Sequence, residues 1–527
     1  MPHTPNSRSS HSRSSLVRNT LKIGSSTVLS KILGMVRDIL MIRFLGVSAA
    51  SDAFNAAFRL PNSLRRIFAE GALSAAFIPA LVRVVKDEGQ VAASRLITRM
   101  VWIVEGIVAL VCLLIMIFAQ QVVSITVPGF SDAQMVYAVP LLRVLIFFLF
   151  FVSSSALFGG ALQAIHRFFI PSISQVVLNG VLIVGLLACL FFNLPVITLA
   201  WIIVFGGFIT LILHIGAYLR HQFSFERSDI ATSREVRAVL WRFLPCIASL
   251  GMVEVSLFID QQFISFFPVG SITLWNNAAN FMRLPLGIGI VSFTTALLPH
   301  ISRVSAYAPQ RLSYYLFESL KSVVWIVVPI ILIMSFFAQD IFMTLFMSEN
   351  FSYTHVLQAK TLLVILLVGL FFFAINRIMI NMFYALHETF LPTLVTIGGT
   401  VLNTALNFVA MYWGGINGIA WATVIAAALQ SLAFLLLLRY RFRFTLYLKP
   451  FFIFARNALV QMGLLLAVFY LLFRVGYFLM QRLPESLSLF FTYKIGFWLW
   501  VGPLCCLFAL AYFLTRRYFR IKLYFFE

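Results

Sequence analysis

The chain has 527 residues, of which 61% are hydrophobic and only 11% are charged, and its formal net charge is +21. Soluble domains carry about 25% charged residues, so this composition excludes an ordinary soluble protein. The Lys and Arg residues stand mostly in short loops between apolar runs, where they orient membrane helices, and this placement argues against nucleic-acid binding.

Apolar segments long enough to cross a bilayer, about 20 residues each, recur along the whole chain. They predict an all-α polytopic membrane protein with about fourteen transmembrane helices and no separate soluble domain. The predicted spans are residues 19–47, 51–84, 98–127, 134–163, 171–193, 195–220, 236–267, 274–302, 314–345, 355–386, 390–412, 417–439, 451–480 and 488–515.

The segments outside the spans give the expected orientation. Residues 1–18 are polar and basic and precede no cleavage site, so we expect a cytoplasmic tail. Lys and Arg then gather in the cytoplasmic loops and in the tail at 516–527, whereas most opposite loops have none. One outer loop, with Arg474 and Arg482, breaks this pattern. Both termini are therefore expected to be cytoplasmic.

An internal repeat divides the chain. The segment AIHRFFIPSI (164–173) recurs as ALHETFLPTL (385–394), 221 positions later, and the Arg-Leu-Pro at 59–61 recurs at 283–285. Six spans fit into one period, so we expect an N-lobe at 19–220 and a C-lobe at 236–439, related by an axis along the membrane normal. Such pairs of lobes hold their site between them near mid-membrane. The last two spans, at 451–515, are an addition.

Ionisable residues inside membrane spans are costly and usually mark a functional path. On a helical wheel of the first span, Lys31, Arg37 and Asp38 share one polar arc that does not overlap the apolar arc. Arg43 lies off this stripe near the end of the span, where its side chain can reach the interface.

The second span repeats the pattern. Asp52, Arg59, Arg66 and Glu70 share one face, whereas Arg65 falls on the far side. Pro61 is expected to kink this helix, so the angular positions that the wheel gives to residues beyond Pro61 are approximate.

Two later spans add polar groups. Asn280 and Arg283 are three residues apart in the eighth span. Glu254 and Asp260 in the seventh are candidates for binding a coupling cation, although helix packing explains them equally well. The cysteines lie inside apolar runs without metal-ligand spacing, and we expect no metal site.

The inward-facing candidates carry more cations than acids. They are Lys31, Arg37, Arg59, Arg65, Arg66 and Arg283 against Asp38, Asp52 and Glu70. Unpaired buried charge costs free energy, so if these residues only paired with one another between helices, cations and acids should be nearly equal in number. The excess favours a wet cavity for an anionic cargo, because a guanidinium binds two oxygens of a phosphate or carboxylate at once.

At these residues the sequence resembles a known family. SKILGMVRD (30–38), SDAFNAAFRLPNSLRRIFAEGALSAAFIP (51–79) and HRFFIP (166–171) are similar to the MurJ (MviN) lipid II flippases, and LRRIFAEGA is specific to them. The resemblance implies two six-helix lobes plus two C-terminal helices around a central cationic cavity. It implies alternating access that moves lipid II from the inner to the outer leaflet of the bacterial cytoplasmic (inner) membrane. It also implies a groove for the polyprenyl tail at the last two spans.

By motif match, the resemblance implies that Lys31, Arg37 and Arg65 are essential cavity cations and that Asp52 is an important acid. It favours Arg65 where the wheel favours Arg66, and both stay candidates. The family usually has Arg at position 31, Arg at position 280 and an acid at position 283, so this chain departs from it at three positions.

Other functions remain as alternatives. A multidrug exporter of the same superfamily needs an acidic cavity, and this one is basic. A flippase for another polyprenyl-linked oligosaccharide fits the charges, and only the LRRIFAEGA match argues against it. An enzyme lacks support, because the sequence has no paired acidic metal motif, nucleotide-binding loop or catalytic triad. We expect a monomeric transporter with lipid II as its partner, no catalytic residues and no cofactor, driven by the membrane potential or a cation gradient.

Overall fold

The computed structural model describes residues 29–67, 73–226, 241, 251, 254–255, 257–287, 291–445 and 447–526. Within this part of the chain every regular element is a helix, apart from a single bridge between Ser348 and Phe351. The chain divides into two compact units, unit 1 (Met1–Ile272) and unit 2 (Thr273–Glu527). The all-helical expectation is confirmed.

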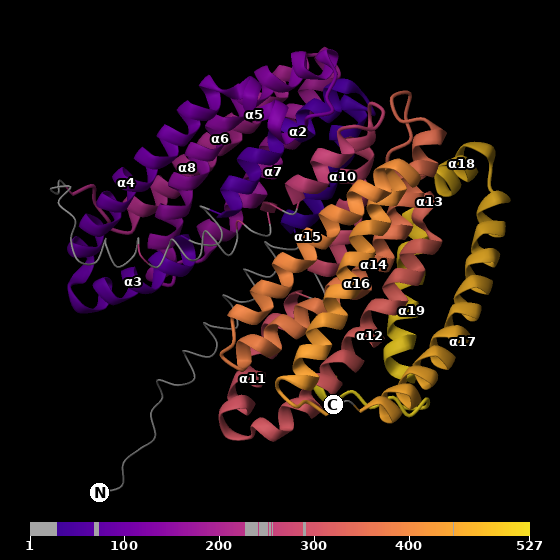
Figure 1. The fold of residues 1–527 in the computed structure, drawn as a ribbon. Coiled ribbons are helices and arrows are strands. Elements are labelled where there is room, and N and C mark those ends of the chain that lie inside the picture. The colour runs from indigo at the N-terminus through magenta and orange to yellow at the C-terminus, as the bar shows by residue number, and fades with distance from the viewer. Residues whose placement is uncertain are drawn as a thin grey trace, which may run out of the picture. The chain divides into compact units, whose positions relative to one another are not determined.

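Unit 1 is built around one long central helix, α6, which packs against α2, α3, α4 and α8 (Figure 1). A fully buried row that includes Leu145, Leu149 and Ala161 forms its core. The elements are a helix over 29–45, α2 (Ala49–Arg65), α3 (Leu73–Asp87), α4 (Gly89–Ile117), α5 (Ala119–Thr126), α6 (Asp132–Ala164), α7 (Phe169–Phe192), α8 (Val196–Arg220) and a helical segment at 257–264.

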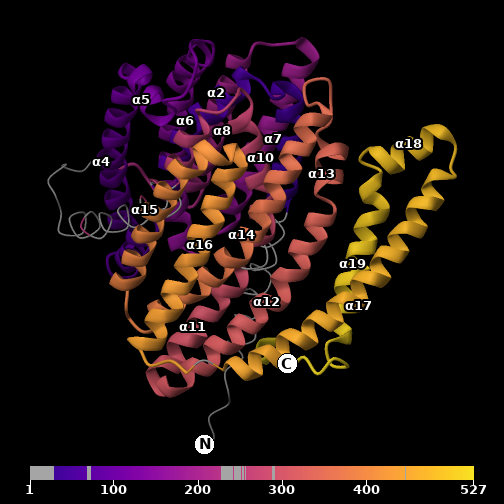
Figure 2. The same ribbon diagram turned by 45° about the vertical axis from the view of Figure 1, so that its right-hand side comes forward.

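Unit 2 is built in the same way around α14, which packs against α11, α12, α13 and α16. The elements are α10 (Ser271–Pro285), α11 (Val291–Tyr307), α12 (Leu312–Phe336), α13 (Ala338–Leu345), α14 (Tyr353–Ala385), α15 (Phe390–Trp413), α16 (Gly415–Tyr440), α17 (Leu448–Gln481), α18 (Glu485–Tyr493) and α19 (Phe497–Thr515). Figure 2 shows α17 and α19 side by side at one edge of this unit, where α17 packs on α12.

Ten helices of the described part are long and apolar enough to cross a membrane, which makes this a multi-pass membrane protein. They are α4, α6, α7, α8, α12, α14, α15, α16, α17 and α19, and they match ten of the predicted spans. The other four predicted spans carry most of the ionisable candidates and lie partly outside the described residues. The number fourteen therefore stays a prediction. Among the ten matched spans, three each hold two helices, with α5, α13 and α18 as the short partners.

The repeat found in the sequence recurs in the backbone of each unit. His166 and His387, 221 residues apart, both take the left-handed conformation, with φ of 60° and 58°. In each turn the amide of the next residue donates to the carbonyl five residues earlier, over 2.8 Å and 3.0 Å. This is the hydrogen-bond pattern that closes a helix and reverses the chain. Both copies thus end their long central helix with the same turn.

A second contact is also repeated in both units. It joins the chain just after α8 to α4 in unit 1, and the chain just after α16 to α12 in unit 2. The Ser224 amide donates to the Ser94 hydroxyl over 3.2 Å, and the Thr445 amide donates to the Ser313 hydroxyl over 3.2 Å. A residue in the left-handed conformation precedes each contact. It is Gln222 in unit 1 and Arg443, 221 positions later, in unit 2. The two units therefore share local geometry as well as helix order.

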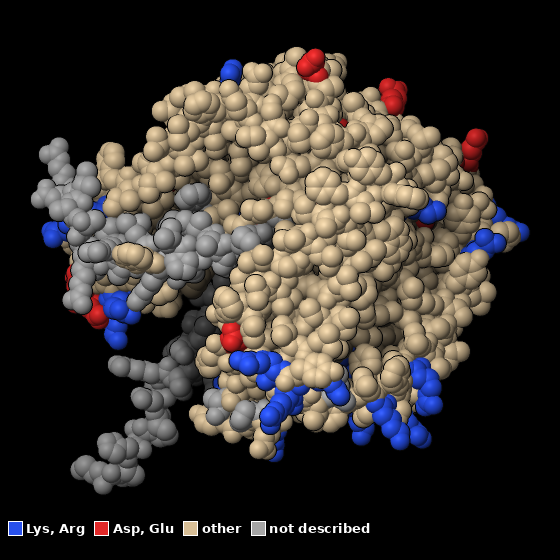
Figure 3. Space-filling model, viewed as in Figure 1, with Lys and Arg blue, Asp and Glu red and all other residues tan. Residues whose placement is uncertain are grey.

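Lys and Arg side chains gather at the end of unit 2 that carries the C-terminus (Figure 3). The loops between α11 and α12 and between α16 and α17 and the tail after α19 supply them. Large apolar side chains are exposed on the helices themselves, such as Trp421 on α16 and Leu464 on α17. Such exposure suits contact with lipid tails.

The repeated turn makes a stability prediction. Glycine takes a positive φ without a steric cost, whereas elsewhere it loses backbone entropy. We expect His166→Gly to keep or raise the free energy of unfolding, by about 0.5 kcal/mol, and Arg167→Gly to lower it by about 0.5–1 kcal/mol. Thermal unfolding of the purified protein in detergent measures both. Equal losses in the two variants would contradict the role given to the turn.

Candidate functional site

The first polar cluster lies on the helix over 29–45. Arg37 donates to Asp38 through Nε (3.0 Å) and Nη2 (2.7 Å), and through Nη1 to the Asn179 side chain of α7 (2.9 Å). Asn179 in turn donates to the carbonyl oxygen of Ser30 (3.0 Å). The Arg37 and Asp38 side chains are 26% and 30% exposed, so water reaches the pair and its contribution to stability is small. The contacts fix the direction of the guanidinium.

Lys31 lies one turn and a half before Arg37 on the same helix and is half-buried. Its ammonium makes no hydrogen bond or ion pair with any residue that the structure describes. Asp38, its conceivable partner on the wheel, is occupied by Arg37. Of the two cations on the polar arc of this helix, Lys31 and Arg37, only Lys31 has no partner among the described residues.

The second cluster is centred on Asp52 at the start of α2. Its side chain accepts from the Gly270 amide (2.6 Å) and from the Gln134 side chain of α6 (3.4 Å), and the residue is only 1% exposed. Amide hydrogens that point at a buried carboxylate stabilise its charged form. Asp52 thus fastens α2 and α6 to the turn at residue 270.

The third cluster joins the other end of α2 to the segment at 254–264. Glu254 accepts from the Ser63 hydroxyl (2.5 Å) and from Arg66 (3.0 Å), and its side chain is 9% exposed. One turn away, Arg59 donates to the Leu257 carbonyl (3.0 Å) and lies over the Phe258 ring. The acid predicted as a coupling-cation ligand is therefore engaged by an arginine and a serine of α2.

The remaining candidates are less closely tied to these clusters. Arg65 is half-buried and its Nε donates to Asn62 (3.1 Å), on the same helix. Arg283 donates to Asn280 (3.4 Å) on α10 of unit 2, and Asn280 is exposed. Asp260 is 6% exposed. Glu70 lies outside the described residues. The described residues hold no group of three or more His, Cys, Asp or Glu side chains suited to a metal ion.

The polar partners Asn179 and Gln134 are absent from the sequence-based candidates, whereas Ser63 lies on the polar face of the second span. Asn179 and Gln134 are neutral residues that each contact a charged residue far away in the sequence, so no local pattern identifies them. The one available signal is that an amide or hydroxyl inside a membrane span needs a partner within the protein.

The family model and two curated relatives agree on one family. The family model for the lipid II flippase MurJ matches residues 41–496. A probable lipid II flippase MurJ from Buchnera aphidicola subsp. Baizongia pistaciae is 30% identical over 402 residues, which are 74% of this chain and 77% of the relative. The lipid II flippase MurJ of Burkholderia cenocepacia is 28% identical over 434 residues, with 81% and 84% covered.

Two solved structures illustrate the shared fold. A lipid II flippase MurJ in an inward closed conformation matches with a TM-score of 0.74 and 22% identity, over 94% of this chain and 98% of that one. An inward-facing multidrug resistance MATE family transporter of the MOP superfamily matches with a TM-score of 0.67 and 16% identity, over 78% and 94%. These likenesses establish the fold.

The Glu254 cluster makes a testable prediction. Glu254→Ala removes the acceptor of two side chains, and we expect it to lower the free energy of unfolding by roughly 2 kcal/mol, since Arg66 remains partly hydrated. In a double-mutant cycle, Glu254 and Arg66 should couple by about 1 kcal/mol, whereas Glu254 and the neighbouring Arg65 should be additive to about 0.5 kcal/mol. Denaturant unfolding in mixed micelles measures the cycle. Equal coupling of both arginines would refute the pairing.

Proposed function

We propose that this chain, which belongs to the lipid II flippase MurJ family, moves lipid II from the inner to the outer leaflet of the bacterial cytoplasmic membrane. The observation that carries the proposal is the match of the family model over residues 41–496. The similarity extends to the fold, since the solved MurJ structure covers 94% of this chain. The molecule is a transporter.

The chemistry of the first helix supports this cargo. Lipid II carries a pyrophosphate and peptide carboxylates, and cations in a wet, partly apolar setting attract such groups more strongly than cations in bulk water. Lys31 has an open ammonium, and Arg37 has a guanidinium held by Asp38 and Asn179. A preoriented guanidinium loses less freedom when a phosphate binds. We assign binding of the anionic head group to Lys31, Arg37 and Arg65.

The other charged residues of α2 are assigned a positioning role. Asp52, Arg59 and Arg66 each contact the segment at 254–270, so they set the position of α2 on that segment. Movement of the cargo by alternating access requires such contacts to hold in one state and to rearrange in another. Glu254 and Asp260 then sense a cation or the membrane potential only by exchanging their present partners. This basic set of residues also disfavours export of organic cations.

The function is tested by depleting the protein in cells and labelling lipid II in the outer leaflet. We expect depletion to abolish outer-leaflet labelling while lipid II accumulates inside, and an ionophore that collapses the driving gradient to have the same effect. Lipid II that stays accessible from outside after depletion would sink the proposal.

Rescue of the depleted cells tests the site. Arg37→Ala and Lys31→Ala each remove a cation from the polar stripe, and we expect at least a tenfold loss of flipping, since a charged hydrogen bond contributes about 1.5–3 kcal/mol. Arg43→Ala is the matched control, because Arg43 is an exposed cation of the same helix that lies off the stripe. Equal effects of the three variants would show that helix charge in general, and not this stripe, matters.

We further propose that the chain is monomeric and that both termini are cytoplasmic. The cationic end of unit 2 carries the C-terminus, and cytoplasmic loops are enriched in Lys and Arg (Figure 3). A reporter that is active only in the cytoplasm, fused after Glu527, should therefore be active. A periplasm-specific reporter at the same place should be silent, and the opposite result would reverse the topology.

A further inference from the structure

A basic pocket of about 360 Å³ opens in unit 2 where α12, α17 and the C-terminal tail meet. Its lining includes four cations, Lys321 of α12, Lys449 of α17, and Arg520 and Lys522 of the tail. None of the proposed head-group residues lies in this pocket, and the flippase function leaves these four cations without a role.

Lys321 forms the inner wall of the pocket. Its ammonium donates to both carboxylate oxygens of Glu318 (2.8 and 3.0 Å), and the two side chains are only 9% and 4% exposed. The same ammonium lies over the rings of Phe317 (5.0 Å) and Phe454 (5.4 Å). Glu318 balances the charge of Lys321, so the excess positive charge of the pocket comes from Lys449, Arg520 and Lys522.

The tail holds two of those cations in place. Ile521 and Leu523 are buried (2% and 0% exposed), and Arg520 and Lys522, which alternate with them, are exposed. The next residue, Tyr524, donates its amide to Glu318 (3.3 Å). The tail is therefore anchored on α12, and its cations are set in the pocket before any ligand arrives. Neither they nor Lys449 have an acidic partner within 4 Å among the described residues.

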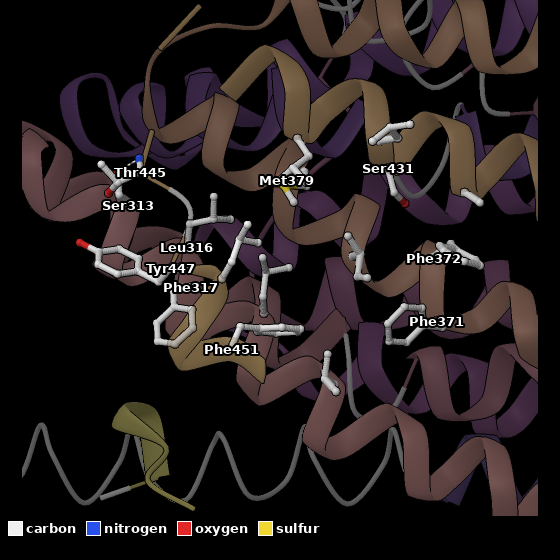
Figure 4. Close-up of a pocket in the computed structure, with 17 residues that line it drawn as sticks. Ser313, Leu316, Phe317, Phe371, Phe372, Met379, Ser431, Thr445, Tyr447 and Phe451 are labelled. Atoms are coloured by element: carbon white, nitrogen blue, oxygen red, sulfur yellow. Dashed lines mark hydrogen bonds between the residues drawn. The ribbon is translucent and has the colours of Figure 1, made fainter. Parts of the chain in front are cut away.

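An apolar groove adjoins the basic pocket. It has a volume of about 370 Å³ and is lined by α12, α14, α16 and the start of α17. Figure 4 shows Phe317, Phe371, Phe372 and Phe451 pointing into it. Phe317 lines both spaces, and Leu448 of the groove directly precedes Lys449 of the pocket. The two spaces thus form one site with a cationic end and an apolar end.

We propose that this site binds an anionic glycerophospholipid, with its phosphodiester in the basic pocket and an acyl chain in the groove. Three cations without an acidic partner among the described residues attract a phosphodiester, and basic pockets between helices at the cytoplasmic side of membranes are suited to lipid head groups. The volume of the groove is at the lower end of the range for whole ligand sites, about 300–1,000 Å³, which suits one acyl chain better than a long polyprenyl chain. The site consists of unit 2 residues alone and does not depend on flipping.

The test is lipid binding to the purified full-length protein by native mass spectrometry. Phosphatidylglycerol and phosphatidylcholine with the same acyl chains are titrated, together with a polyprenyl phosphate. We expect one tightly bound phosphatidylglycerol and weaker phosphatidylcholine. Lys449→Gln/Lys522→Gln should weaken phosphatidylglycerol roughly 25-fold, since each cation near the membrane surface contributes about a factor of five. Ala428→Phe, which fills the groove without a change of charge, should weaken both phospholipids.

Arg439→Gln/Arg441→Gln is the matched control, since it removes two exposed cations near the same end of unit 2 outside the pocket. Less than a twofold change is expected from it. Equal losses in the two double variants would show general surface attraction and overturn the site. Preferential binding of the polyprenyl phosphate would overturn the ligand. Because the assay measures binding without flipping, a negative result here leaves the proposed function standing, and a failed flipping assay leaves this site standing.

Discussion

A polar group within the hydrocarbon layer must find its partner inside the protein, because no water is available to replace it. This constraint agrees with the contacts of α2, which lies in the second predicted span. Three of its side chains reach the segment at 254–270: Asp52 accepts from the Gly270 amide, Arg59 donates to the Leu257 carbonyl, and Arg66 pairs with Glu254. One polar face therefore docks the whole helix. Any rearrangement of α2 has to exchange these contacts together, which favours discrete states over gradual bending.

The same constraint separates cations that are held from cations that are open. Arg66 and Arg59 each donate to an acceptor in the segment at 254–270, whereas the Lys31 ammonium meets none among the described residues. Arg37 is intermediate, since an acid and an amide orient it while about a quarter of its side chain stays exposed. The excess of positive charge seen in the sequence is thus smaller than a count of residues suggests. What is left lies on the first helix and on two arginines that donate to neutral side chains, Arg65 to Asn62 and Arg283 to Asn280.

The long apolar runs were sufficient to predict most of the fold. An 18-residue apolar window has few alternatives to a membrane helix, so α6, α7 and α14 match the predicted spans to within a few residues. The repeat was visible because His166 and His387 occupy the same left-handed turn. The partners were not predictable. Asn179 lies 142 residues from Arg37, and Glu254 lies 188 residues from Arg66, and such contacts depend on how whole helices pack. The wheel placed Arg66 on the polar face of its helix, and its partner Glu254 is a contact that sequence periodicity cannot supply.

The repeat also explains why the additional helices start where they do. In both copies a serine of the third helix receives an amide from the chain just after the sixth helix, Ser94 from Ser224 and Ser313 from Thr445. In the second copy the chain leaves this fixed point and enters α17 within three residues. Because α17 then packs on α12, Lys449 comes to line the same pocket as Lys321. The contact that both units share thus fixes the start of α17, which has no counterpart among the described helices of unit 1. The position of α17 in turn places the basic pocket beside the apolar groove.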